Sequence, residues 1–374
     1  MTVLPAGEPG RVEVDLGAGV LSLDIARATR PLDSLCGFAR RRNPKRAFLI
    51  VSRLLGRHIP VRPSAMRAAA RELAAALPAD LPGPVLTVGL AETAICLGQT
   101  VHEERAALRG GESHYLHSTR QQIDASLLCR FEEPHSHASA HLVYRPRELD
   151  PARVRTLILV DDEISTGTTL VNLAAAIANH LPALERIAVA ALTDWSGGEA
   201  WLKAMPRAAR AASLLQGRLE WRPAAPVGEE AGFAAVAGRL GRIERHWNSG
   251  RLGLAAGDPV ELPDYRPPAG RHRLRIVGTG EFTYPPFLLA ERLEREGHDV
   301  VVQATSRSPI VLGGAVDTVI GFADNYGTGV PNFLYNADPS DGRHSIICHE
   351  TPAGSVDPAL IRALGAETLF FEGP

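Results

Sequence analysis

The sequence feature that most constrains the fold is the segment TLILVDDEISTGTTL, Thr156 to Leu170, in which a nearly all-apolar run meets three consecutive acids. A buried strand accounts for the apolar half, and a helix start accounts for the small polar residues of STGTT. Neither accounts for three adjacent carboxylates, whose mutual repulsion needs a ligand or a partner to offset it. Ligands of open α/β sheets bind at the carboxyl ends of strands, where this strand would deliver Asp161 and Asp162.

The residues after the strand suit a phosphate group. A helix start offers unpaired backbone N–H groups and the positive end of the helix dipole, and Gly167 permits close approach of the backbone. Hydroxyl donors come from Ser165, Thr166, Thr168 and Thr169. The two upstream aspartates can accept hydrogen bonds from a vicinal diol, so the segment predicts a ribose 5-phosphate site. The alternative is a strand followed by a Ser/Thr-capped helix without a ligand.

Strand-like and helix-like segments alternate along the chain, which predicts an α/β fold with a parallel sheet covered by helices. The stretch LGLAAGDPVELPDYRPPAGR is rich in Pro and Gly and has no helical period, and a further strand–loop–helix–strand pattern follows it. We therefore predict a first domain over residues 1–251, a linker over 252–270 and a second, smaller α/β domain over 271–374.

Composition narrows the class of protein. The formal net charge of −2 argues against a nucleic-acid partner bound through bulk electrostatics. The 4 cysteines are scattered and read as reduced cytosolic thiols, without a disulfide framework or a zinc site. The first residues lack a signal-peptide pattern, and no apolar run is long enough to span a bilayer. We expect a cytoplasmic protein without a membrane partner.

The string LILVDDEISTGTT resembles the PRPP-binding signature of type I phosphoribosyltransferases, which PRPP synthases and some regulatory proteins share. The resemblance implies that pyrophosphate is displaced from PRPP by a nitrogen nucleophile, with Asp161 and Asp162 on the ribose hydroxyls. It also implies Mg²⁺ near these aspartates, bridging pyrophosphate and ribose oxygens without direct protein ligands. The 5-phosphate would be held by Glu163, Ile164, Ser165, Thr166, Gly167, Thr168 and Thr169. Enzymes for 6-oxopurines carry an acid where this chain has Ser165, so hypoxanthine and guanine are disfavoured as acceptors.

Two further parts of the type I pattern have counterparts. The resemblance implies a pyrophosphate loop made of Gly89, Leu90, Ala91, Glu92 and Thr93, although strand–Gly–helix turns occur in any α/β protein. It also implies a hood within residues 120–144, where Arg120 and Arg130 would contact pyrophosphate. The hood histidines form a weak metal pattern, so one of them, His137 for the leaving group, is the better assignment. His135 and His141 would contact the acceptor or pyrophosphate; alternatively, the hood histidines are solvated and have no role.

Two more strings, RRNPKRAFLIVSRLLGRHIPV (Arg41 to Val61) and TSRSPI (Thr305 to Ile310), resemble hallmarks of one bacterial group. In that group an orotate phosphoribosyltransferase-like domain is fused to a C-terminal TRSP domain. The group is associated with tellurite-resistance and stress-response gene clusters, which implies a nucleotide-like metabolite, and similar enzymes are commonly homodimers. Lys45 and Arg46 would then contact the acceptor or pyrophosphate, whereas charge runs of this kind also occur as solvated faces.

The C-terminal unit carries a predicted second ligand site. The loop Ser306, Arg307 and Ser308 would bind an anion, and Asp324 and Tyr326 precede two glycines of another loop. The alternative is a structural or oligomerising appendage. For the whole chain, the leading hypothesis is a phosphoribosyltransferase, and the runner-up is a PRPP or nucleotide sensor without turnover. A PRPP synthase would need an ATP-binding half before the loop, which we do not find.

Overall fold

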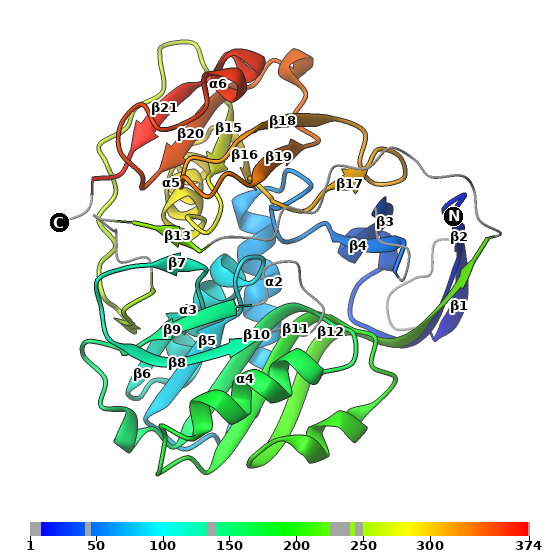
Figure 1. The fold of residues 1–374 in the computed structure, drawn as a ribbon, viewed down its shortest axis with the longest axis vertical. Helices are drawn as coiled ribbons and strands as arrows, with labels where there is room; N and C mark the ends of the chain where they lie inside the picture. Colours follow the sequence, from blue (N-terminus) through cyan, green and yellow to red (C-terminus); the bar gives the residue numbers. More distant parts are fainter. Residues whose placement is uncertain (1–8, 42–45, 133–139, 225–239, 244–249, 373–374) are drawn as a thin grey trace.

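The fold is described from a computed structural model that places residues 9–41, 46–132, 140–224, 240–243 and 250–372. It contains a large mixed sheet and a smaller parallel sheet, which lie at opposite ends of the molecule in Figure 1. The α/β class predicted from the sequence is confirmed. The predicted domain boundaries stay a prediction.

The large sheet has eight strands in the order β1-β2-β12-β11-β10-β5-β6-β14. The five strands from β12 to β6 are parallel, and β1, β2 and β14 add antiparallel edges. Their bounds are β1 Gly10–Asp15, β2 Gly19–Ala28, β5 Val85–Gly89, β6 Ser113–His117, β10 Thr156–Ile164, β11 Arg186–Asp194, β12 Ala208–Pro223 and β14 Leu254–Ala255. The edge strand β14 lies within the predicted linker.

Helices cover both faces of this sheet, as the strand sequences require. Ile158 and Val160 of β10 pack with the helix residues Ala70 and Leu73, whereas Leu157 and Leu159 face the opposite core. This alternation follows from the two-residue period of a strand, and apolar residues at every position allow burial on both sides. The helices are α2 Pro63–Ala76 and α3 Ile95–Arg109 near the first core, and α4 Thr168–Ala178 in the second.

Several short elements surround the large sheet. A hood-like hairpin pairs β8 Leu127–Glu132 with β9 Ala140–Tyr144, and β7 Gln121–Gln122 pairs with β13 Gly241–Arg242. A second small sheet has the order β17-β3-β4 and joins β17 Ile310–Val311 to β3 Cys36–Arg41 and β4 Phe48–Ser52. The remaining short helices are α1 Leu32–Leu35, η1 Pro151–Arg153 and η2 Glu199–Ala204.

The smaller sheet consists of four parallel strands in the order β16-β15-β20-β21. Its strands are β15 Arg273–Gly278, β16 Asp299–Ala304, β20 His344–His349 and β21 Glu367–Phe370. It is flanked by α5 Tyr284–Arg295, α6 Pro358–Leu364, η3 Pro339–Asp341 and the hairpin β18 Val319–Ala323 with β19 Pro331–Tyr335.

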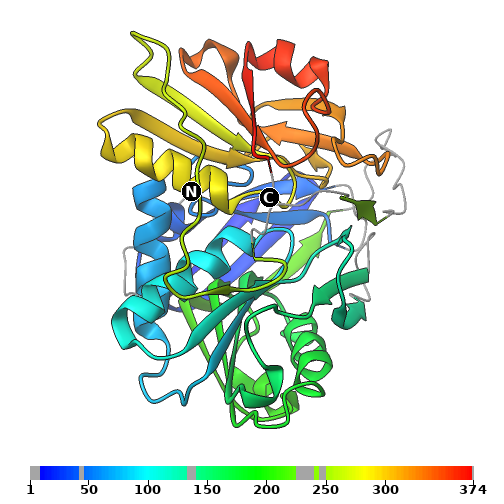
Figure 2. The same ribbon diagram turned by 90° about the vertical axis from the view of Figure 1, so that its left-hand side faces the viewer.

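The two sheets are held together by a helical layer on one side. Figure 2 shows α5, in yellow, beside the blue helix α2. Arg67 of α2 links the helices, with Nε donating to Glu291 of α5 at 2.9 Å and Nη1 to Glu103 of α3 at 2.7 Å. The backbone of Val61 also exchanges hydrogen bonds with Val302 of β16, at 3.1 and 2.8 Å.

A buried ion network joins the carboxyl ends of the two sheets. Arg251 is fully buried and donates from both Nη atoms to Glu350, which follows β20, at 2.6 Å each. A further bond of 3.4 Å reaches Glu281, after β15. Glu281 in turn accepts hydrogen bonds from the Thr119 hydroxyl and, at 2.6 Å, from the Arg120 backbone N–H, both after β6. Loops at the carboxyl ends of both sheets therefore meet.

Replacing Arg251 tests how strongly this network stabilises the fold. In Arg251→Met the two carboxylates lose their buried partner, which costs about 3–5 kcal/mol in comparable pairs. We expect a clear fall in the guanidinium midpoint of unfolding, measured by tryptophan fluorescence. Arg266→Met is the control, because its ion pair with Asp264 is 87% and 86% exposed and such pairs contribute about 0–1 kcal/mol. Equal midpoints for both variants would contradict the assigned role.

Candidate functional site

The three consecutive acids lie inside β10 and do not follow it, contrary to the sequence expectation. On one side β11 pairs with β10 as far as Ile164, whereas on the other side β5 ends opposite Val160. Asp161 and Asp162 thus lie just beyond the last residue of β10 that pairs with β5, at the carboxyl end of that strand. Asp161 is buried and accepts the Asp162 backbone N–H at 2.9 Å. The predicted location at a strand carboxyl end still applies with respect to β5.

The predicted phosphate loop follows β10 and leads into α4. Gly167 is the N-cap of α4, with φ of +79°, and a side chain there would collide with the indole of Trp201, 2.4 Å from its Cβ position. Ser165, Thr166 and Thr168 are exposed, and Thr169 is half-buried, so hydroxyl donors and the helix start face solvent. The Ile164 side chain lies in the core, so only its backbone is available to a ligand.

Glu163 forms an ion pair with Arg46, a residue of the N-terminal region. Nη2 of Arg46 donates to Oε1 of Glu163 at 2.5 Å, and the Arg46 guanidinium lies over the ring of Phe48, 4.9 Å from its centroid. Burial raises the pKa of Glu163, and Arg46 opposes that shift. The positive charge of Arg46 therefore offsets part of the repulsion between Glu163 and the two neighbouring aspartates.

The predicted pyrophosphate loop lies next to the acids. Leu90 N–H donates to the Val160 carbonyl at 3.0 Å, and the Thr93 hydroxyl donates to Asp162 at 2.8 Å. At Gly89 an added Cβ would lie 2.6 Å from the Tyr115 hydroxyl, so only glycine fits there. The side chains of Leu90 and Ala91 are buried. The Glu92 carboxylate is bound by two arginines, Arg57 at 3.2 Å and Arg307.

The predicted hood residues divide between two environments. Nη2 of Arg120 lies 3.2 Å from Nε2 of the buried His141, whose Nδ1 bonds Ser118 at 3.2 Å. Arg130 is exposed and lines a cavity of about 270 Å³ together with Asp124 and Arg242. Lys45, His135 and His137 lie outside the described residues. Among the described residues, no group of three His, Cys, Asp or Glu side chains is arranged to hold a metal ion.

One residue of the predicted second ligand site, Arg307, contacts the predicted pyrophosphate loop. Arg307 reaches Glu92 of the predicted pyrophosphate loop, and Ser306 shares a 3.3 Å hydrogen bond with Nε2 of His58. Ser308 donates its N–H to the Ser306 hydroxyl at 3.2 Å. Asp324 instead holds its own loop by accepting from Tyr326 and Thr328 backbone N–H groups at 2.7 and 3.1 Å.

The loop after β4 contributes an arginine that the sequence reasoning did not single out. Arg57 is buried and donates from Nη1 to the Gly280 and Thr305 carbonyls at 2.6 and 2.7 Å. Its signal in the sequence is a charged residue within the mainly apolar stretch LLGRHIPV. Glu281, Arg251 and Glu350 were also missed, because their pairing joins positions far apart in the chain.

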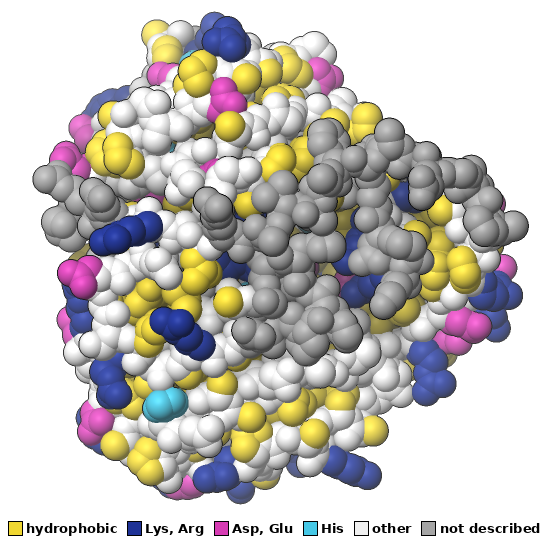
Figure 3. All heavy atoms as spheres, in the orientation of Figure 1, with side chains coloured by type: hydrophobic (Ala, Val, Ile, Leu, Met, Phe, Trp, Pro, Cys, Tyr) yellow, Lys and Arg dark blue, Asp and Glu magenta, His cyan; other side chains and the backbone are white. Residues whose placement is uncertain are grey.

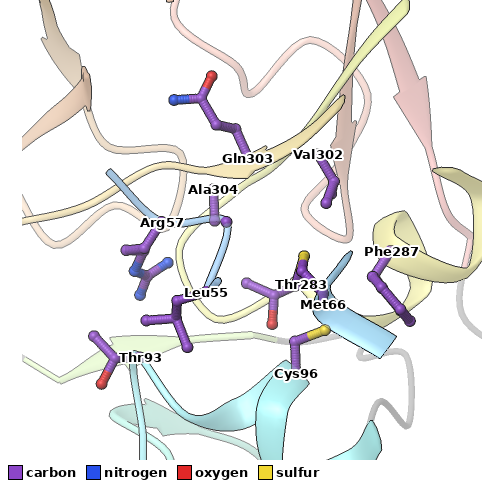
Figure 4. Close-up of a pocket in the computed structure, with 11 residues that line it drawn as sticks. Leu55, Arg57, Met66, Thr93, Cys96, Thr283, Phe287, Val302, Gln303 and Ala304 are labelled. Atoms are coloured by element: carbon purple, nitrogen blue, oxygen red, sulfur yellow. The ribbon is translucent and has the colours of Figure 1, made fainter. Parts of the chain in front are cut away.

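Arg57 also borders a small cavity between the two sheets. Its volume is about 10 Å³, close to the least that can hold one water molecule. Figure 4 shows Arg57 and Thr93 at one end of this cavity, Phe287 at the other, and Ala304 of β16 above Arg57. The face of the molecule in Figure 3 carries basic and acidic side chains interspersed, in keeping with the formal net charge of −2. No described helix is long and apolar enough to cross a bilayer.

Comparisons with families of known proteins cover most of the chain. A phosphoribosyl transferase family model matches residues 35–218. A second model, described as the TRSP domain C-terminal to that transferase, matches residues 257–364. Together with the strand order, the first match confirms the predicted type I phosphoribosyltransferase fold with an additional domain. The comparison with curated proteins found no match.

Solved structures of phosphoribosyltransferases resemble the chain distantly. Adenine phosphoribosyltransferase from Rhodothermus marinus is 16% identical over 50% of this chain and 96% of its own, with a TM-score of 0.36. The Giardia lamblia enzyme in complex with 9-deazaadenine is 22% identical over 41% and 80%, with a TM-score of 0.30. Orotate phosphoribosyltransferase from Aeropyrum pernix is 16% identical over 45% and 78%, with a TM-score of 0.28.

Substituting Gly167 tests the packing of the phosphate loop. Gly167→Ala combines a left-handed backbone with a collision against Trp201, whereas Gly111→Ala meets no atom within 4 Å at a similar φ of +84°. The backbone term, about 1 kcal/mol, is common to both. Overpacking adds about 1–3 kcal/mol at Gly167 alone. We expect a larger loss of unfolding free energy for Gly167→Ala in denaturant titrations. Equal losses would mean that Trp201 moves aside without cost.

His58 makes stability depend on pH. Burial lowers the pKa of His58 from 6.5 to about 3. The unfolded chain therefore takes up a proton below pH 6.5 that the folded protein excludes, so stability falls as pH drops through this window. The contribution is about 2 kcal/mol between pH 7 and pH 5. Unfolding free energies at both pH values should differ less in His58→Gln than in the wild type. The exposed His180→Gln is the control and should retain the wild-type difference.

Proposed function

We propose that this chain, which joins a phosphoribosyl transferase domain to a TRSP domain, transfers ribose 5-phosphate from PRPP to a nitrogenous base-like acceptor and releases pyrophosphate. The family match supports a pentosyltransferase enzyme in general terms. One observation carries the proposal. Asp161 and Asp162 are followed directly along the chain by the solvent-facing turn Ser165–Thr168, where α4 starts. Diol acceptors and phosphate donors then lie on one continuous segment.

The chemistry required of the site is mainly electrostatic. As the bond between the anomeric carbon and pyrophosphate breaks, positive charge develops on the ribose and negative charge on the leaving group. Carboxylates at Asp161 and Asp162 would orient the ribose hydroxyls and stabilise the cationic ring. Arg120, whose guanidinium lies beside His141, is our candidate for contact with the leaving group. His137 stays a prediction for its protonation.

Mg²⁺ is part of the proposal because the residues fit it. The cation prefers oxygen ligands and keeps several waters, so it is commonly bound by substrate phosphates and one or two carboxylates. Asp161 and Asp162 are oxygen donors of this kind beside the predicted pyrophosphate loop. Bound Mg²⁺ would neutralise charge on the leaving pyrophosphate. The protein's own part is to hold the ribose and the 5-phosphate in position.

Ser165 narrows the class of acceptor. Enzymes for 6-oxopurines carry an acidic residue at this position, whereas Ser165 is an exposed residue without a carboxylate. We therefore propose an acceptor other than hypoxanthine or guanine, with orotate-like bases included. We further propose that the product is a nucleotide-like metabolite used in tellurite or stress response. The protein would act in the cytoplasm as a homodimer. The second candidate is a non-catalytic PRPP or nucleotide sensor, since some regulatory proteins share the PRPP-binding signature.

Removal of the two aspartates tests the ribose site. In Asp161→Asn/Asp162→Asn the charged acceptors for the diol are lost, and each such hydrogen bond contributes about 1.5–3 kcal/mol. We expect calorimetric titration with PRPP and Mg²⁺ to give at least about 100-fold weaker binding than the wild type. The exposed pair Asp24→Asn/Asp80→Asn changes the charge equally and should bind as the wild type does.

Pyrophosphate release separates the enzyme from the sensor. Wild-type protein offered PRPP, Mg²⁺ and a panel of nitrogenous bases should release pyrophosphate with at least one of them. PRPP binding without release across the panel would favour the sensor. Absence of PRPP binding to the wild type would reject the transferase and the PRPP sensor and leave only a sensor of nucleotides.

A further inference from the structure

Two arginines from distant parts of the chain converge on one carboxylate. Arg57, after β4, donates from Nη2 to Oε2 of Glu92 at 3.2 Å, and Arg307, after β16, pairs with Oε1 of the same group. All three side chains are largely enclosed, with exposures of 4%, 16% and 13% for Arg57, Arg307 and Glu92. Glu92 therefore bridges the transferase unit and the C-terminal unit.

Within the bridge itself, the two cationic side chains outnumber the one carboxylate. Two guanidinium groups share a single carboxylate, and burial lowers the pKa of both Arg57 and Arg307 to about 10. Among the described acids nearby, Glu281 pairs with Arg251. Asp162 and Asp324 accept hydrogen bonds only from uncharged groups in these contacts, and their negative charges oppose the lowering of the pKa of Arg57 and of Arg307, respectively. A phosphate group has more acceptor oxygens and more negative charge than one carboxylate, so it can replace Glu92 as the shared partner of the two arginines.

The position of the bridge identifies the anion. Glu92 belongs to the predicted pyrophosphate loop, and the next residue, Thr93, donates to Asp162 at 2.8 Å. A phosphate group that reached the two arginines would thus lie beside the carboxylate proposed for the ribose hydroxyls. Guanidinium groups are strong partners of phosphate oxygens, and each arginine presents its Nη2 donor toward Glu92.

We propose that Arg57 and Arg307 form a shared binding site for the pyrophosphate end of the substrate, and that Glu92 occupies their donors until phosphate oxygens replace it. This inference rests on the proposed transferase function and assigns a role to the C-terminal unit. The TRSP unit then completes the transfer site by supplying Arg307. The same contacts would stabilise the negative charge that grows on departing pyrophosphate.

A purely structural bridge makes the opposite prediction for Glu92. If Glu92 only fastens the two units together, its neutralisation weakens the interface and every ligand site within it. If Glu92 competes with the ligand, its neutralisation releases the arginines and strengthens anion binding. The sign of the change in Glu92→Gln therefore separates the two roles.

The test is calorimetric titration of the full chain with three probes: Mg²⁺-pyrophosphate, Mg²⁺-PRPP and ribose 5-phosphate. We expect Arg307→Ala to bind the first two about 10- to 100-fold more weakly, since a charged hydrogen bond contributes about 1.5–3 kcal/mol. Ribose 5-phosphate should bind within about twofold of the wild type. Arg307→Lys should recover part of the loss, and Glu92→Gln should bind pyrophosphate several-fold more tightly.

Arg343→Ala is the matched control, because Arg343 is also largely enclosed in the C-terminal unit but pairs with Asp299 at the other end of the small sheet. It should bind all three probes as the wild type does, whatever its unfolding midpoint. If Arg307→Ala does not fold, Arg307→Lys carries the comparison, with weaker pyrophosphate binding expected than in the wild type.

The outcomes separate this inference from the proposed function. Wild-type PRPP binding that Arg307→Ala and Arg307→Lys leave unchanged overturns the inference and leaves the transferase standing. Pyrophosphate binding that depends on Arg307, without any PRPP binding, supports the arginine site and rejects the transferase. Weaker pyrophosphate binding in Glu92→Gln overturns the role of Glu92 as a competitor. If the wild type binds neither Mg²⁺-pyrophosphate nor Mg²⁺-PRPP, both proposals are rejected.

Discussion

The fully buried charge of Arg251 is the constraint on which the arrangement of the two sheets depends. A guanidinium group without water must find carboxylates, and its partners Glu350 and Glu281 follow two strands of the smaller sheet. Glu281 also accepts from Thr119 and Arg120 at the end of β6. Because each of these groups is costly to bury alone, they fix the carboxyl ends of both sheets against each other.

This opposition of strand ends determines what the site contains. Carboxyl ends of parallel strands collect the loops that bind ligands, and here two sets of such loops meet. The loop after β5 brings Glu92, the loop after β16 brings Arg307, and Arg57 comes from the segment after β4. The proposed transferase site and the C-terminal unit, which look separate in the sequence, therefore share one set of charges.

Much of the first unit could be predicted from sequence because its signals are local. The apolar run of β10, the left-handed Gly167 before α4 and the strand–Gly–helix pattern around Gly89 each depend on neighbouring residues. The expected end of the strand before Asp161 was wrong, because β11 continues to pair as far as Ile164. Strand ends are set by the partner strand, which a single segment does not reveal.

The sequence by itself determined the α/β class and the chemical character of the DDEISTGTT segment. Periodicity, glycine positions and acid placement act over a few residues, so they can be read without the fold. Only the tertiary structure decided that Glu163 pairs with Arg46, that Arg251 lies between two distant glutamates, and that Arg307 reaches Glu92. These pairs join residues that are 30 or more positions apart, and folding must bring their elements together before burial can favour the contacts.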